Sequence, residues 1–251
     1  NGTQNPTIAS STTAMGGVYT VTVTNAAGCT ATAMTTVIVN ALPTPTATNT
    51  GPYCAGSTIQ LNSSGGIGYT WSGPLAYSNA TQNPTIASAT TGMAGVYTVT
   101  VTDASGCTAT AMTTVTVNAL PVLTATNTGP YCEGTTIQLS STGGLGYSWS
   151  GPLAYSNATQ NPTIASSTTG MGGVYTVTAT NASGCTATAM TTVTVNALPT
   201  PTATNTGPYC TGSTIQLNST GGTGYTWSGP LAYSNGTQNP TIASSTTAMG
   251  G

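Results

Sequence analysis

Apolar and polar residues alternate with a period of two along much of the chain, as they do in strands that have one buried face. In residues 96–101 we assign the valines to one face and the tyrosine and threonines to the other. Residues 110–117 end in the same way, with Val115 and Val117 on one face. No segment has the period of a helix. The pattern therefore predicts an all-β chain.

Turn residues divide the pattern into short strands. From Ala41, two prolines make residues 41–46 a stiff connector. Gly-Pro and Ala-Gly pairs turn the chain around Cys54, and a looser segment runs through Tyr77. We predict strands at residues 46–50, 58–62, 69–71 and 84–88, followed by a hairpin of residues 96–102 and 108–117. Such a series of strands is typical of a small antiparallel β-sandwich.

The whole pattern repeats every 78 residues, as the two cysteine series 54, 132, 210 and 29, 107, 185 show. A fixed period indicates an array of modules. With boundaries at the Ala-Leu-Pro linkers, we predict complete repeats at residues 41–118 and 119–196, the back half of a repeat at 1–40 and the front part of another at 197–251. We favour a window onto a longer periodic chain, and the alternative is an end that receives its missing hairpin from the next chain.

Threonine (60) and serine (23) make up a third of the 251 residues, whereas Lys, Arg, His and Phe are absent. A disordered or mucin-like stalk is the alternative that this composition raises. The repeated period of two favours folding, and threonine suits a strand because its branched β-carbon fits a pleated surface.

The composition also excludes most enzyme chemistry. Without histidine or lysine, and with Asp103 and Glu133 as the only acids, no repeat can hold a paired-carboxylate site, a Ser-His-Asp relay or a metal cluster. Neither acid recurs, and we expect both at solvated loop positions. Nucleic acid is excluded because binding a polyanion depends on Lys and Arg. We therefore predict no enzyme, no cofactor and, from the short apolar stretches, no membrane span.

The order of motifs resembles the B-strand, C-strand tryptophan and tyrosine-corner pattern of immunoglobulin-like domains, with matches at Ile59, Leu61, Trp71, Gly95, Tyr97 and Val99. The unit is also similar to the tandem immunoglobulin-like and PKD-like repeats of large secreted bacterial surface proteins, including gliding-motility adhesins, through residues 69–73, 82–84, 97–102 and 106–107. This resemblance implies an extracellular or cell-surface bacterial protein. The cysteines of the antibody-type core are replaced by Ser63 and Val99, so that bridge is absent.

Six cysteines without C-x-x-C spacing or basic neighbours predict structural disulfides, with free buried thiols as the alternative. In an immunoglobulin-like unit the loops of Cys54 and Cys107 lie at opposite ends, about 23 Å apart, whereas bridged Cα atoms lie within about 7 Å. In an end-to-end array the loop of Cys54 abuts the unit that carries Cys185. We favour that pair, with the partners of Cys29, Cys132 and Cys210 in further repeats or another chain. The rival is pairing of sequence neighbours, namely Cys29–Cys54, Cys107–Cys132 and Cys185–Cys210.

Sequons offer glycosylation sites at Asn1, Asn79, Asn157 and Asn235, which share one repeat position, and at Asn62, Asn181 and Asn218. Chance sequons are common in a chain this rich in threonine, and O-linked sugars are a second route. A net charge of −2 gives little repulsion between molecules. We therefore expect both covalent glycans and association with copies of itself.

Aromatic residues offer two interpretations. Tyr69, Trp71 and Tyr77 could form a sugar-binding platform. We favour a core role for the tryptophans and a corner role for the tyrosine that bonds back to the backbone, at Trp71, Trp149 and Trp227 and at Tyr19, Tyr97 and Tyr175.

These features together predict a structural segment of a long extracellular filament, fibre or stalk, stiffened by proline linkers and disulfides between repeats. The alternative is an adhesion or carbohydrate-binding module, which needs an exposed aromatic or acidic cluster.

Overall fold

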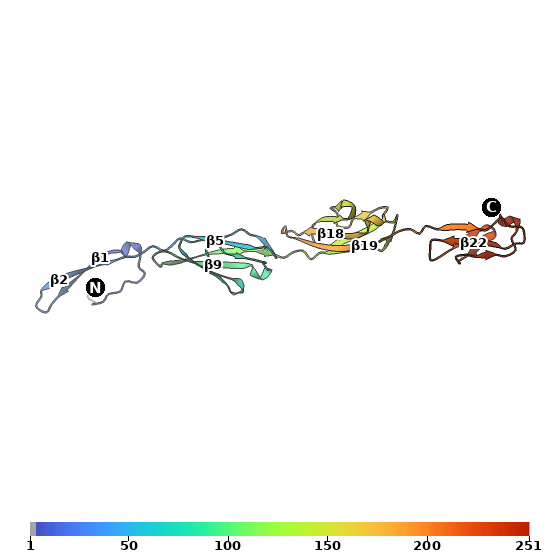
Figure 1. Cartoon of the computed structure of the whole chain (residues 1–251). Helices are drawn as coiled ribbons and strands as arrows, with labels where there is room; N and C mark the ends of the chain where they lie inside the picture. Colours follow the sequence, from blue (N-terminus) through green and yellow to red (C-terminus); the bar gives the residue numbers. More distant parts are fainter. Residues whose placement is uncertain (1–3, 251) are drawn as a thin grey trace. The chain divides into compact units, whose positions relative to one another are not determined.

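The computed structural model describes residues 4–250, which form strands and short 3-10 turns (Figure 1). The chain divides into two compact units, Asn1–Pro121 with Thr180–Ala187, and Val122–Ala179 with Thr188–Gly251. The described residues contain no helix long and apolar enough to span a membrane.

The first unit holds a complete sandwich of two antiparallel sheets. One has the order β3-β5-β8, with β3 at Thr46–Asn49, β5 at Ile59–Ser64 and β8 at Thr85–Ile86. The other has the order β10-β9-β6-β7, with β10 at Thr108–Val115, β9 at Gly95–Thr102, β6 at Gly68–Gly73 and β7 at Tyr77–Asn79. The short strand β4 (Tyr53–Cys54) pairs in parallel with β11 (Val117–Asn118). Two 3-10 turns, η2 (Pro74–Ala76) and η3 (Thr91–Met93), precede β7 and β9.

The second unit repeats this arrangement. Its sheets are β12-β14-β17 and β16-β15-β18-β19, and its parallel pair is β13 with β20. The bounds are β12 Thr124–Asn127, β13 Tyr131–Cys132, β14 Ile137–Thr142, β15 Gly146–Gly151, η4 Pro152–Ala154, β16 Tyr155–Asn157, β17 Thr163–Ile164, η5 Thr169–Met171, β18 Gly173–Thr180, β19 Thr186–Val193 and β20 Val195–Asn196.

Two further segments each hold part of this topology. In the first unit, η1 (Thr13–Met15) precedes a hairpin of β1 (Gly17–Thr24) and β2 (Thr30–Val37). In the second unit, the sheet β21-β22-β25 lies beside the pair β23-β24. Their bounds are β21 Thr202–Asn205, β22 Ile215–Thr220, β23 Trp227–Gly229, η6 Pro230–Ala232, β24 Tyr233–Asn235, β25 Thr241–Ile242 and η7 Thr247–Met249.

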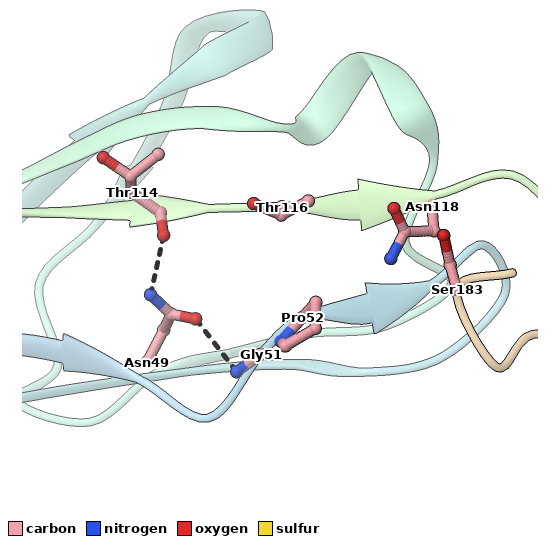
Figure 2. Close-up of a pocket in the computed structure, with 7 residues that line it drawn as sticks. All are labelled: Asn49, Gly51, Pro52, Thr114, Thr116, Asn118 and Ser183. Carbon is pink, nitrogen blue, oxygen red and sulfur yellow. Dashed lines mark hydrogen bonds between the residues drawn. The ribbon is translucent and has the colours of Figure 1, made fainter.

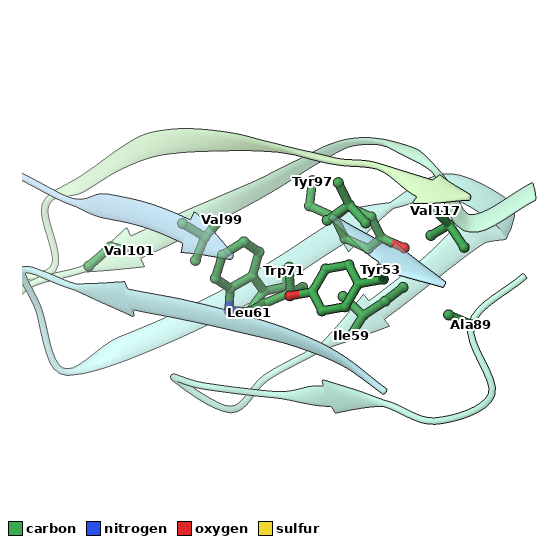
Figure 3. Packing of buried hydrophobic residues seen from close by; sticks show 10 residues of the cluster. Tyr53, Ile59, Leu61, Trp71, Ala89, Tyr97, Val99, Val101 and Val117 are labelled. Atoms are coloured by element: carbon green, nitrogen blue, oxygen red, sulfur yellow. The ribbon is translucent and has the colours of Figure 1, made fainter. Parts of the chain in front are cut away.

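Alternation along each strand places the core between the two sheets of a complete sandwich (Figure 3). Ile59 and Leu61 of β5 meet Trp71 of β6, and all three are fully buried. On β9 the buried face consists of Tyr97, Val99 and Val101. The tyrosine therefore shares the face of the valines at 99 and 101, contrary to our face assignment, and Val96 points outward because residues two apart share a face.

The tyrosine corner is present in both complete sandwiches. The Tyr97 hydroxyl donates to the Met93 carbonyl oxygen at 3.0 Å, and that of Tyr175 donates to Met171 at 3.0 Å. Tyr97 also stacks edge-to-face on Tyr77, with ring centroids 5.5 Å apart. The two-sheet order, the core tryptophan and this corner define antiparallel immunoglobulin-like sandwiches.

Two elements differ from the sequence-based prediction. The turn around Cys54 contains the strand β4, whose parallel partner β11 lies more than sixty residues later. The looser segment through Tyr77 contains β7, which pairs with β6. Neither strand has enough residues to show a period, so their pairing depends on tertiary contacts.

Candidate functional site

The most specific feature of the first unit is a disulfide between Cys54 and Cys185, with Cα atoms 5.6 Å apart. Cys54 ends the strand β4, whereas Cys185 lies in the loop between β18 and β19. This is the pair that the sequence analysis favoured over pairing of sequence neighbours. Cys185 is almost fully buried.

The loop before Cys185 is shaped by one side chain. The Asn181 Oδ1 accepts hydrogen bonds from the backbone N–H groups of Ser183 and Cys185, each at 3.0 Å. Its Nδ2 donates to the Ala119 carbonyl oxygen at 2.8 Å. In the hairpin of β9 and β10, the Asp103 Oδ1 accepts the equivalent two hydrogen bonds, from the backbone N–H groups of Ser105 and Cys107. Asp103 therefore serves as a turn residue, because a carboxylate oxygen accepts these backbone hydrogen bonds as well as an amide oxygen does.

The loop of Cys54 is fixed by Tyr53. Its hydroxyl donates to the Gln60 carbonyl oxygen at 2.9 Å and accepts from the Thr50 N–H at 2.9 Å. Its backbone N–H donates to the Thr116 carbonyl oxygen at 2.9 Å. These bonds hold Cys54 in one position, which favours a single disulfide partner.

A groove of about 530 Å³ lies beside these loops (Figure 2). The Asn49 Nδ2 donates to the Thr114 carbonyl oxygen at 2.9 Å, and its Oδ1 accepts from the Gly51 N–H at 2.9 Å. The lining is neutral and lacks aromatic rings, and it consists of Asn49, Gly51, Pro52, Thr114, Thr116, Asn118 and Ser183. It therefore offers neither an ionisable group for catalysis nor a ring for stacking on sugars.

The other four cysteines have no bonded partner within residues 4–250. Cys29, Cys132 and Cys210 are exposed, and Cys107 is half-buried. No group of three or more His, Cys, Asp or Glu residues that could hold a metal ion occurs in this described part.

The sequons fall into distinct environments. At Asn79, Asn157 and Asn235, the side-chain oxygen accepts from the backbone and the hydroxyl of the threonine two residues later, each at 2.8 Å. The amide of Asn181 is instead used in the bond to Ala119. Asn62 and Asn218 are half-buried on β5 and β22, and Asn1 lies outside the described residues.

Tyr69, Trp71 and Tyr77 do not form an exposed platform. Trp71 is fully buried, and its Nε1 donates to the Gln82 carbonyl oxygen at 3.2 Å. Tyr69 and Tyr77 are half-buried. Trp149 and Tyr175 are fully buried in the second sandwich. Burial raises the pKa of Tyr97, and its proximity to Tyr77 adds to the shift.

Two residues predicted as core are not core residues in the structure. Tyr19 is 38% exposed, although its hydroxyl donates to the Met15 carbonyl oxygen at 2.8 Å like the other corner tyrosines. Trp227 is half-buried. Among the described residues, the hairpin that carries Tyr19 forms a sheet of its own. Trp227 lines a pocket with Ile215 and Leu217 of β22, but no strand equivalent to β9 pairs with its strand β23.

Neither the known family models nor the curated protein sequences give a match to this chain. Among solved structures, the three N-terminal domains of the bacteriophage RB49 Highly Immunogenic Outer Capsid protein align at 21% identity, over 79% of this chain and 80% of that one, with a TM-score of 0.34. The N-terminal four Ig domains of Dscam1 isoform 7.44 align at 17% identity over 71% and 54%, with a TM-score of 0.27. The amphioxus IgVJ-C2 molecule aligns at 16% over 57% and 98%, with a TM-score of 0.28. The fold assignment above rests on sheet order and core rather than on these similarities. An immunoglobulin-like fold with a disulfide is consistent with an extracellular or cell-surface protein.

Proposed function

We propose that this chain is a structural segment of an extracellular filament or cell-surface stalk, built of tandem immunoglobulin-like repeats on a bacterial surface. The observation that carries the proposal is the Cys54–Cys185 disulfide. It ties the front loop of one predicted repeat to the hairpin loop of the next, and the bond from Asn181 to Ala119 joins the same hairpin loop to the linker. Such a staple has a use where neighbouring repeats must stay together under load.

The composition suits this role. The chain has no Lys or Arg and therefore no trypsin site, and its two acids leave few charges that salt or pH could change. Each complete sandwich also buries a core of its own, so one repeat can unfold while its neighbours stay folded.

Electron microscopy of the secreted material, labelled with antibodies raised against this chain, tests the proposal. We expect decoration along fibres or stalks at regular intervals. Labelling of dispersed particles without fibres would contradict the filament role.

Covalent glycans belong to the same proposal, since they would hydrate a surface with little charge. The favoured sites are Asn79, Asn157 and Asn235, whose amide nitrogens are not used in the hydrogen bonds that shape the turn. At Asn181 a glycan would replace the bond to Ala119. Mass spectrometry of native material should find sugar at the first three sites and none at Asn181. An intact mass of 24.6 kDa for this segment would refute the glycans.

The adhesion alternative has less support. An adhesion module needs an exposed aromatic or acidic cluster. Trp71 is fully buried, and the groove of Figure 2 is lined by neutral residues. An enzymatic role has no support from the groove either, because its lining lacks an acid, a base and an activated nucleophile.

A further inference from the structure

Each complete sandwich leaves the outer face of its four-stranded sheet exposed. On β9 the three buried residues are the odd-numbered ones from Tyr97 to Val101, so the even-numbered residues of this strand point outward. Directly opposite residues share a face, and Thr98 lies between Met112 of β10 and Ser72 of β6. The even-numbered residues of β6, β7, β9 and β10 therefore form one outer surface, which we call the threonine face.

The threonine face combines hydroxyl groups with two apolar side chains. It holds seven threonines and two serines, together with Gly68, Val96 and Met112. Val96 is 51% exposed and Met112 is 66% exposed. Val96 pairs with Thr114, and Met112 lies two residues before Thr114, so the two apolar side chains are diagonal neighbours on the sheet. Covering this face with a second surface removes both apolar side chains from water, which is favourable.

The second sandwich presents the same face. The even-numbered residues of β15, β16, β18 and β19 match those of the first sandwich, except that Ser148 replaces Thr70. Val174 is 52% exposed and Met190 is 66% exposed, almost as in the first sandwich. The two sandwiches have different neighbours along the chain. The exposure is therefore a property of the sheet itself and does not depend on what precedes or follows a sandwich.

The chemistry of the threonine face suits a like surface. It carries no charge, because the two acids, Asp103 and Glu133, lie in loops outside its strands. Two copies of the face therefore do not repel each other. Each hydroxyl both donates and accepts a hydrogen bond, so two such faces can satisfy one another's polar groups. We propose that the threonine face of one chain docks side by side on the threonine face of a second copy.

The glycans that we propose leave this face free. Asn79 ends β7, but it is an odd-numbered residue and its side chain lies on the side opposite to that of Ser78. Asn62 lies on β5, in the other sheet of the sandwich. Asn181 lies in the loop between β18 and β19. None of the even-numbered residues that form the threonine face is an asparagine, so no sequon begins on it.

The area of the face explains why a periodic partner is favoured. Strands lie about 4.8 Å apart and rise about 3.4 Å per residue, so each residue covers about 16 Å² of sheet. The four strands of one sandwich hold 25 residues, or about 400 Å². A stable interface needs about 800 Å² per partner. One pair of faces is therefore a weak contact, and a second pair between the same two chains reaches the required area. A second copy is a partner whose faces recur with the same 78-residue period.

The first test measures association of the whole 251-residue chain by analytical ultracentrifugation, with the free thiols alkylated so that no disulfide joins two chains. We expect association that increases with concentration and does not weaken when the ionic strength rises from about 0.1 M to 1 M, because the face carries no charge. A chain that stays monomeric up to about 1 mM, or association that is lost at high salt, would overturn the proposal.

A pair of matched variants tests which face is used. Met112→Asp combined with Met190→Asp puts one carboxylate on the threonine face of each sandwich, and we expect association about 100-fold weaker because an unpaired charge is costly to bury. Thr48→Asp combined with Thr126→Asp adds the same charge to the outer face of the other sheet and should leave association unchanged. All four residues are exposed, so both variants should fold, which urea unfolding checks. Equal weakening by the two variants would overturn the proposal.

A mixing experiment tests the occupant of the face. Met112→Lys combined with Met190→Lys should also weaken self-association, because like charges then meet across the two faces. Mixing this variant with Met112→Asp, Met190→Asp should restore association, since opposite charges then meet. Failure to restore it would show that the threonine face docks on a different surface, and would reject the like face as occupant. Sugar on Thr98 or Thr110 in the native material would also overturn the proposal, because a glycan there would cover the face.

This inference rests on the proposed filament role for its biological use, but the two can fail separately. Fibres in the native material combined with a purified chain that stays monomeric would retain the filament and reject the docking face. Association of the purified chain through the threonine face, without fibres in the native material, would do the reverse.

Discussion

The sulfur atoms of Cys54 and Cys185 are bonded across a sequence separation of 131 residues. The loop that this bond closes includes most of the first complete sandwich and much of the second. A force applied to the ends of the chain is therefore carried by the disulfide, and the residues inside the loop are not stretched.

Single-molecule stretching should show directly that the loop is not extended while the disulfide is intact. Reduction of the disulfide should add about 430–470 Å of contour length, because an extended chain spans roughly 3.3–3.6 Å per residue over the 131 residues of the loop. Cys185→Ser should give the long contour with and without reductant. Cys107→Ser, which removes a free thiol, should leave the difference unchanged. Equal contour lengths of the wild-type chain in both conditions would contradict the bond.

The hydroxyl of Tyr97 should contribute to stability through its bond to the Met93 carbonyl oxygen. Tyr97→Phe removes this bond from a buried ring, and we expect a loss of about 1 kcal/mol in the free energy of unfolding. Tyr19→Phe is the matched control, because Tyr19 lies on β1, outside this sandwich, and its bond to Met15 is exposed to water, so the free energy of unfolding of the first sandwich should stay unchanged. Urea unfolding followed by the fluorescence of Trp71, in a background with Trp149→Phe and Trp227→Phe, measures the first sandwich. Equal losses in both variants would contradict the prediction.

Gly73→Ala tests the packing of the ring of Tyr97 on the backbone. Gly73 has φ −172°, an extended conformation open to any residue, so the cost is steric alone. With an added Cβ 2.5 Å from the ring, we expect a loss of about 1–3 kcal/mol. Gly229→Ala should change stability by less than about 0.5 kcal/mol, since the nearest atoms to its added Cβ are those of Tyr233, at 3.8 Å. Comparable destabilisation by both variants in urea would argue against this contact.

Stability should respond to pH mainly at alkaline values. Burial raises the pKa of Tyr77, Tyr97, Tyr155 and Tyr175 in the folded chain above the usual value of 10.0. The neutral phenol is thus favoured by folding, so this stability is fully present below pH 10 and is lost as pH rises through the folded-state pKa values. Without histidine, the chain should keep a constant free energy of unfolding between about pH 6 and 9. Urea titrations with the free thiols alkylated measure this, and a transition near pH 6.5 would contradict it.

Much of the fold follows from local pattern. The strands at residues 46–49, 59–64 and 95–102 lie within a few residues of their predicted positions, because a period of two and turn residues are local signals. The two-residue strand β4 was missed, since its strand partner β11 is remote in sequence. The face predicted for residues 96–101 was wrong at Val96 and Tyr97. A strict period of two puts Tyr97 on the face of the valines at 99 and 101, and Val96 on the opposite face.

The candidate site also combines features that the sequence shows with features that depend on tertiary contacts. The offsets of the six cysteines are visible in the sequence, and together with the resemblance to immunoglobulin-like domains they favoured one pair. No local pattern indicates the bond from Asn181 to Ala119, because the two residues are brought together by folding. Nor does the sequence show that the amide of Asn181 is engaged and that of Asn79 is not, since both residues begin an Asn-x-Ser/Thr sequon.

The sequence by itself determined an uncharged, all-β array of repeats without the side chains of common catalysis, since composition and period do not depend on contacts. Only the tertiary structure decided which equivalent residues are core residues. Trp71 and Trp227 occupy the same repeat position, yet one is fully buried and the other half-buried. Burial is a property of what packs against a side chain. For Trp71 the neighbouring strand is β9, which pairs with β6, whereas among the described residues β23, the strand of Trp227, pairs with β24 alone.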